Sequence, residues 1–170
     1  MQTLAENARA LVRDWHPASP TEQLSADSFA AYFLGAESPM MRGDGPHHAT
    51  ASGLVLDASL THALLVYHRK GRFWVQPGGH VEPGDALLAD TARREVREET
   101  GVVISDALAY DLDHHALGSR FGQCTSHLDV GFAFIADVET ALTVSDESED
   151  RKSTRLNSSH SDRSRMPSSA

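Results

Sequence analysis

Three carboxylates crowd one short segment near the middle of this 170-residue chain. Glu95, Glu98 and Glu99 stand at positions i, i+3 and i+4, which share one face of an α-helix. Like charges this close repel one another, so the arrangement favours a cation bound between them. Hard divalent ions such as Mg2+, or Mn2+ in its place, take oxygen ligands of this kind. The spacing therefore predicts a divalent-metal site on a helix.

The helix that positions these acids is predicted over residues 86–100. An apolar stripe runs along it beside the acids, at a period of about 3.6 residues, and consists of Leu88, Ala92 and Val96. Asp85 is placed to cap the N-terminus, and Gly101 is placed to end the helix in a left-handed conformation. Arg94 lies beside Glu98 at i+4, so we expect these two side chains to pair.

The stretch around this helix resembles the signature of Nudix hydrolases. The second half of that signature is matched in full by Arg94-Glu95-Val96-Arg97-Glu98-Glu99-Thr100-Gly101-Val102. The first half departs from it, because the sixth residue after Gly79 is Asp85 instead of glutamate, and eight residues instead of seven separate Asp85 from Arg94. The resemblance implies an α/β fold, with a mixed sheet between helices, and cleavage of a pyrophosphate bond in a nucleotide or a nucleoside diphosphate linked to another group.

The resemblance also implies roles for single residues. The expected catalytic residues are Arg94, Glu95, Glu98 and Glu99, and the expected metal ligands are Glu95, Glu98, Glu99 and the carbonyl of Gly78. Arg94 would orient one of the acids through a charge-assisted hydrogen bond. The proton of the attacking water would pass to a glutamate of the signature or to a later acid such as Glu147. Asp85 is expected to have no catalytic role.

The chain is also rich in histidine, with ten in all. No pair of cysteines and no His-x-x-x-His spacing accompanies them, so a zinc site is not expected. Gly79, His80 and His127 are expected to contact the substrate instead. Residues 114–126 are expected to form a long loop over the site.

Helices are predicted over residues 3–15 and 20–36, the second one started by Ser19-Pro20-Thr21-Glu22. Residues 1–45 would form a helical extension, which either packs on the main domain or joins two copies in a homodimer. The main domain is expected at 46–149. Its predicted strands are residues 49–56, 63–68, 73–75, 108–112 and 128–138.

The last segment, residues 150–170, has no apolar periodicity and is expected to be a disordered tail. Residues 150–160 and 164–170 resemble a translated sequencing-library adapter, so we expect this tail to be non-native. By the Nudix resemblance, a further strand and a C-terminal helix would be missing after Glu149. The sheet would then carry an unpaired edge.

Composition excludes some functions. A formal charge of −9 argues against binding to a nucleic acid polymer, which requires clustered basic residues. The single Cys124 cannot form an intramolecular disulfide, which fits a reducing cytoplasm. No apolar run approaches the roughly 20 residues of a membrane span.

Three alternatives to an active hydrolase share the same fold. A module that binds nucleotides without cleaving them should have lost some of the acids, whereas this chain keeps all three. An isomerase of isopentenyl-type diphosphates would need a cysteine on an early strand, whereas Cys124 follows the signature. A hydrolase inactivated by its missing C-terminal segment remains open.

Overall fold

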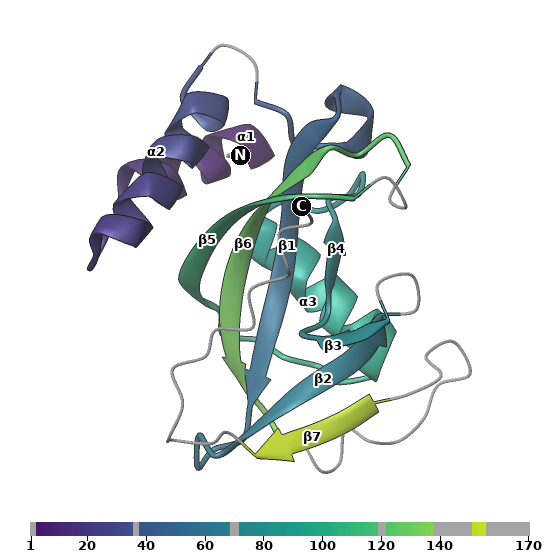
Figure 1. Cartoon of the computed structure of the whole chain (residues 1–170). Coiled ribbons are helices and arrows are strands. Elements are labelled where there is room, and N and C mark those ends of the chain that lie inside the picture. The colour runs from purple at the N-terminus through teal and green to yellow at the C-terminus, as the bar shows by residue number, and fades with distance from the viewer. Residues whose placement is uncertain (1–2, 36–37, 69–71, 119–121, 138–150, 156–170) are drawn as a thin grey trace.

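The computed structural model describes residues 3–35, 38–68, 72–118, 122–137 and 151–155 (Figure 1). The helices are α1 (Leu4–Arg13), α2 (Pro20–Phe33) and α3 (Leu88–Thr100), with a short 3-10 helix η1 (Arg42–Asp44). The strands are β1 (His47–Leu56), β2 (His62–His68), β3 (Phe73–Val75), β4 (Gly78–His80), β5 (Leu108–Ala116), β6 (Ser126–Ile135) and β7 (Arg151–Arg155). None of the helices described is long and apolar enough to cross a bilayer.

The strands form one mixed sheet in the order β3-β2-β1-β6-β5, with β4 also paired to β1 and β7 to β2. The central strand β1 runs parallel to β6 along its whole length, from His47 opposite Ser126 to Leu56 opposite Ile135. The pairs β1–β2, β1–β4 and β5–β6 are antiparallel. The predicted α/β fold, a mixed sheet flanked by helices, is confirmed (Figure 1).

Helix α3 covers one face of this sheet (Figure 1). The predicted apolar stripe is fully buried, with Leu88, Ala92 and Val96 each 0% exposed. On the facing strand, Gly53 lies so close to Val96 that a Cβ atom on the glycine would overlap Val96 Cγ2. The C-terminus of α3 is Gly101 at φ +78°, the left-handed stop that the sequence predicts.

The N-terminal helices pack against the same domain. Ser19 Oγ accepts a hydrogen bond from the Glu22 amide at 3.2 Å, which confirms the predicted start of α2. Asn7 Oδ1 accepts a hydrogen bond from the Leu88 amide at 3.0 Å and so joins α1 to the beginning of α3. Ser28 of α2 is hydrogen-bonded to His114 of β5, with 2.6 Å between Oγ and Nδ1.

The strands differ from the predicted pattern in two places. Gly78–His80 forms β4, because β2 pairs with β1 at Leu56 and leaves the edge of β1 around Ala51 open to another strand. The loop expected over residues 114–126 is shorter than predicted, since β5 extends to Ala116 and β6 begins at Ser126.

The prediction of a disordered tail is wrong for residues 151–155, which form β7 antiparallel to β2. An exposed strand edge offers unpaired N–H and C=O groups that pair with any extended segment, so no apolar pattern is needed to form such a strand. Residues 150 and 156–170, and Glu147 with them, lie outside the described part of the chain.

Candidate active site

Arg94 is the centre of the charged cluster on α3. Its Nη1 donates hydrogen bonds to Glu95 Oε1 at 2.9 Å and to Glu98 Oε2 at 3.2 Å. Its Nη2 donates to the His80 carbonyl at 2.8 Å and to Asp85 Oδ2 at 3.1 Å. The predicted pairing of Arg94 with Glu98 is therefore confirmed. The guanidinium also joins the last turns of α3 to β4 and to the segment before the helix.

The two glycines of β4 lie against the acidic face. The Gly78 amide donates a hydrogen bond to Glu99 Oε2 at 3.1 Å. A Cβ atom on Gly79 would lie only 2.6 Å from Glu95 Cδ, so only glycine leaves room for this carboxylate. Burial raises the pKa of Glu95, and the nearby charges of Glu98 and Glu82 add to this, while Arg94 acts in the opposite direction.

Asp85 does not cap α3, contrary to the prediction. The helix begins at Leu88, and the Leu87 amide donates to Asp90 Oδ2 at 3.0 Å instead. Asp85 accepts hydrogen bonds from Thr91 Oγ1 at 2.9 Å and from Arg94. Burial alone would raise the pKa of Asp85, but these hydrogen bonds hold it below its ordinary value. The residue thus acts as an anion that holds Arg94 in place.

The cluster carries an excess of negative charge. Asp85, Glu95 and Glu98 all approach the single guanidinium of Arg94 within 3.2 Å. The Glu98 side chain is 51% exposed, so its oxygens are accessible from solvent. Oxygen donors with uncompensated charge are what a hard divalent cation takes. The residues present therefore fit such an ion chemically.

Four potential ligands of a different kind meet on the other side of the sheet. His48 of β1 stands in register with His127 of β6, and Thr50 with His80 of β4, so these side chains share the face opposite α3. The ring centroids of His80 and His127 are 4.9 Å apart, and His48 lies 5.1 Å and 5.2 Å from them. Cys124, 7% exposed, completes the group.

Two of these rings, His80 and His127, have a lowered pKa. Burial, together with the neighbouring histidines and Arg42, lowers the pKa of His80 to about 4 and that of His127 to about 3. The structure thus brings together the two histidines predicted to contact substrate, but it buries the Nε2 atom of each. His48 and Cys124 were missed in the sequence, although the Cys-x-x-His spacing of Cys124 and His127 was a signal for them.

A chain of polar side chains continues along the same face. The Tyr110 hydroxyl donates to Gln76 Oε1 at 3.0 Å, and Gln76 Nε2 donates to Ser52 Oγ at 2.6 Å. The hydroxyls of Ser52 and Thr50 donate in turn to the carboxylate of Asp129. Burial raises the pKa of Asp129, and the two hydroxyl hydrogen bonds oppose that rise. This face of the sheet is therefore polar, in contrast with the apolar face under α3.

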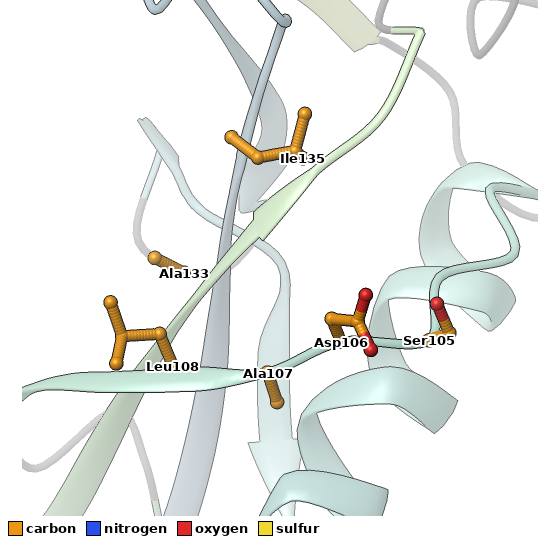
Figure 2. A pocket seen from close by; sticks show the side chains of 6 residues that line it. All are labelled: Ser105, Asp106, Ala107, Leu108, Ala133 and Ile135. Carbon is orange, nitrogen blue, oxygen red and sulfur yellow. The ribbon is translucent and has the colours of Figure 1, made fainter.

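A shallow pocket lies elsewhere, where β5 begins and β6 ends (Figure 2). Its lining residues are Ser105, Asp106, Ala107, Leu108, Ala133 and Ile135. Asp106 is the only ionisable side chain among them, and His127 stands near the opposite end of β6. The pocket therefore lacks the groups that chemistry requires, and the charged cluster on α3 is the better candidate.

Comparison with known proteins shows the family of this chain. The family model described as "NUDIX domain" matches residues 46–159, which is more than half of the chain. A protein of Mus musculus named "Nucleoside diphosphate-linked moiety X motif 6" is 42% identical over 72 residues. That alignment covers 41% of this chain and 23% of the mouse protein, so this chain spans less than a quarter of that relative.

Two solved structures are similar in fold. A MutT/nudix family protein from Enterococcus faecalis is 22% identical, with a TM-score of 0.50 over 83% of this chain and 57% of that one. Shewanella oneidensis NrtR is 19% identical, with a TM-score of 0.50 over 63% of this chain and 51% of that one. At these identities the likeness concerns the fold alone.

Proposed function

This chain belongs to the NUDIX family, and we propose that it is a divalent-metal-dependent hydrolase that cleaves a pyrophosphate bond. Its substrate would be a nucleotide or a nucleoside diphosphate linked to another group. The ion would be Mg2+, or Mn2+ in its place. We place the enzyme in the cytoplasm, acting on a small molecule, with a homodimer as its candidate assembly.

The arrangement of acids around Arg94 carries this proposal. Glu95 and Glu98 share the same Nη1 group of Arg94, and Asp85 holds the other side of the guanidinium. A pyrophosphate is itself an anion, so this acidic face cannot bind it without a cation between them. The charge excess and the all-oxygen donor set both favour a hard divalent ion in that position.

Each residue of the cluster has a proposed part. The ion would be held by Glu95, Glu98, Glu99 and the carbonyl of Gly78. When bound, Mg2+ would neutralise negative charge on the substrate and lower the pKa of a bound water molecule. Arg94 keeps Glu95 and Glu98 oriented, as its two hydrogen bonds to them support. The general base is one of the glutamates of α3 or Glu147.

The substrate would lie against β4. Gly79 is the proposed contact, because a residue without a side chain lets a phosphate group approach the backbone closely. The Nε2 atoms of His80 and His127 are buried, which does not favour their predicted contact with substrate. The name of the mouse relative speaks of a moiety linked to a nucleoside diphosphate, which supports the same substrate class here.

The test is hydrolysis of a panel with Mg2+: nucleoside triphosphates, ADP-ribose, dinucleoside polyphosphates and NADH. Glu98→Gln and Glu99→Gln should each lower turnover by at least about 100-fold, because metal-ion catalysis supplies several kcal/mol. The control is Asp27→Asn, an exposed acid on α2, which should keep full activity. Metal-dependent turnover retained in both glutamine variants would refute the metal assignment.

Binding without cleavage has its own signature. Calorimetry would show that a compound of the panel binds the full chain tightly, while no product accumulates over hours. That result would make the protein a nucleotide-binding module.

A further inference from the structure

The cluster of His48, His80, His127 and Cys124 lies outside the proposed catalytic residues. Each residue offers one ligand atom, and the four atoms all lie within 4.8 Å of one another. Within the described part of the chain this is the one such convergence of three or more His, Cys, Asp or Glu residues. The residues come from β1, β4, β6 and the segment just before β6, so the whole fold is needed to assemble them.

The histidines of this cluster have buried ring nitrogens without a hydrogen-bond partner. Among the described residues, buried side-chain nitrogens without a hydrogen-bond partner occur in Trp15, His48, His80 and His127. Three of these four belong to the cluster, and in each it is the Nε2 atom that lacks a partner. A buried polar atom without a partner is destabilising, so such a concentration indicates that something is bound there.

The tautomer of His48 supports a metal ion as the bound species. Its Nδ1 lies 2.8 Å from the Gly45 carbonyl. A carbonyl only accepts, so in the neutral ring Nδ1 carries the proton and Nε2 carries the lone pair. A metal-binding histidine commonly has its second nitrogen fixed in this way by a backbone carbonyl. The His48 residue is 0% exposed, and it is one of the four residues whose ligand atoms converge.

We propose that His48, His80, His127 and Cys124 form a tetrahedral Zn2+ site. Three imidazole nitrogens and one thiolate are a donor set for zinc, whereas Mg2+ requires oxygen ligands. From bond lengths of about 2.0–2.1 Å to nitrogen and about 2.3 Å to sulfur, ligand atoms in such a site lie roughly 3.3–3.7 Å apart. A contraction of at most about 1.1–1.5 Å from the present 4.8 Å therefore closes the cluster around the ion.

The site is structural, because all four positions are filled by protein ligands. It fastens β4 to β1 and β6 on the face of the sheet opposite α3. His80 links it to the proposed catalytic residues, since its side chain enters the zinc site while its carbonyl receives Arg94 Nη2. The zinc site is nevertheless distinct from the acidic cluster, which contributes no ligand to it.

The first experiment uses the purified full chain. Elemental analysis should find one zinc per chain after loading with Zn2+ and removal of the excess. Co2+ in its place should give the intense visible bands of tetrahedral cobalt and a thiolate-to-cobalt charge-transfer band in the near ultraviolet. Substoichiometric zinc together with no thiolate band would overturn the proposal, leaving ordered water as the occupant of the cluster.

Variants then assign the ligands. Cys124→Ser keeps the size of the side chain and should abolish the thiolate band. It should also weaken Zn2+ binding by more than about tenfold. Mutating a residue that only hydrogen-bonds to a metal ligand already lowers metal affinity by about 10–100-fold, and Cys124 is itself a ligand. His127→Gln should weaken binding similarly, while His16→Gln, an exposed ring outside the cluster, should leave it unchanged. An unaltered cobalt spectrum in Cys124→Ser would overturn the assignment.

A double variant separates the two sites. Glu98→Gln with Glu99→Gln should lose Mg2+-dependent turnover but keep one zinc per chain and the full cobalt spectrum. Loss of zinc from this variant would place the zinc at the acidic cluster and overturn the proposal. Absence of activity in the parent chain would leave the zinc measurements unaffected, so the proposed function and the zinc site can fail independently.

Discussion

The guanidinium of Arg94 and the backbone carbonyl of His80 are joined by a hydrogen bond of 2.8 Å between Nη2 and oxygen. This contact connects α3 to β4, which otherwise meet through the small residues Gly78 and Gly79. Arg94 can make it while also bonding to three carboxylates, because its planar fork carries five N–H donors. A lysine has one ammonium group and cannot reach these partners together.

We therefore expect Arg94→Lys to be destabilising although it conserves charge. Charge-assisted hydrogen bonds contribute about 1.5–3 kcal/mol each, so losing part of the fork should lower the free energy of unfolding by about 2 kcal/mol. Urea denaturation measures the difference. Arg97→Lys, an exposed residue of the same helix, is the matched control and should cost less than about 0.5 kcal/mol. Equal costs for the two changes would contradict this role of Arg94.

The two glycines of β4 should respond differently to alanine. In Gly78→Ala the new Cβ would lie 2.9 Å from Ser52 Cα and 3.0 Å from the Ala51 carbonyl. Backbone atoms cannot turn aside, so we expect a loss of about 2–3 kcal/mol in unfolding free energy. In Gly79→Ala the Cβ meets the Glu95 carboxylate, the end of a side chain that can move.

Gly79→Ala should accordingly cost less than about 1 kcal/mol of stability while turnover falls at least about tenfold, because Glu95 is displaced. Thermal unfolding and a hydrolysis assay on the same two preparations make the comparison. If both alanine variants lost stability equally and kept the same turnover per folded molecule, Glu95 would not depend on Gly79 for its position.

The contact of Gly53 with α3 predicts a compensating pair of mutations. Gly53→Ala would place a Cβ against Val96 Cγ2 and 3.1 Å from Phe134 Cε2. Overpacking of this kind costs about 1–3 kcal/mol. Adding Val96→Ala removes the overlapping methyl groups, so a double-mutant cycle should show a favourable coupling of at least about 1 kcal/mol. If the stability costs of the two mutations were simply additive, α3 as a whole would move to make room for the added Cβ atom, and Val96 would not be the residue that limits the fit.

Tyr110 predicts a dependence of stability on alkaline pH. Partial burial raises the pKa of its phenol to about 12. The hydrogen bond to Gln76 opposes this rise, and the nearby Asp111, Asp129 and Asp113 add to it. The unfolded chain releases this proton near pH 10, earlier than the folded chain does. The contribution of Tyr110 to the free energy of unfolding is therefore lost as the pH rises from about 10 to about 12. Tyr110→Phe should flatten that decline in urea titrations.

Absorbance at the phenolate wavelength provides the direct check. The component that titrates at about pH 12 should disappear in Tyr110→Phe, while the signals of the other two tyrosines remain. An unchanged titration curve would show that another group is responsible.

Local patterns predicted the helix of the site well. The stripe of Leu88, Ala92 and Val96 is buried as its spacing indicates, and Gly101 ends the helix in the predicted conformation. These features depend on residues three or four positions apart, so the sequence contains all the information they need. The cap was mispredicted because Asp85 has a stronger partner in Arg94, which is nine residues away.

The histidine cluster depends on pairing between distant strands instead. His48 and His127 become neighbours only because β1 and β6 run parallel in one particular register. No spacing within either segment shows that register. Likewise, the two glycines of β4 resemble a turn in the sequence, and they form a strand because β1 offers an open edge. Ser52 and Glu95 leave no space for a Cβ atom, which is why both positions are glycine.

The parallel pairing of β1 with β6 also affects how the chain folds during synthesis. Thr50 and Asp129, which face each other across these strands, are 79 positions apart in the chain. The central strand leaves the ribosome long before its longest partner exists, and its edge stays unpaired during that interval. Non-local pairing of this kind slows folding and exposes strand edges to other chains. Slower translation of the segment between these strands should therefore increase aggregation of the nascent chain.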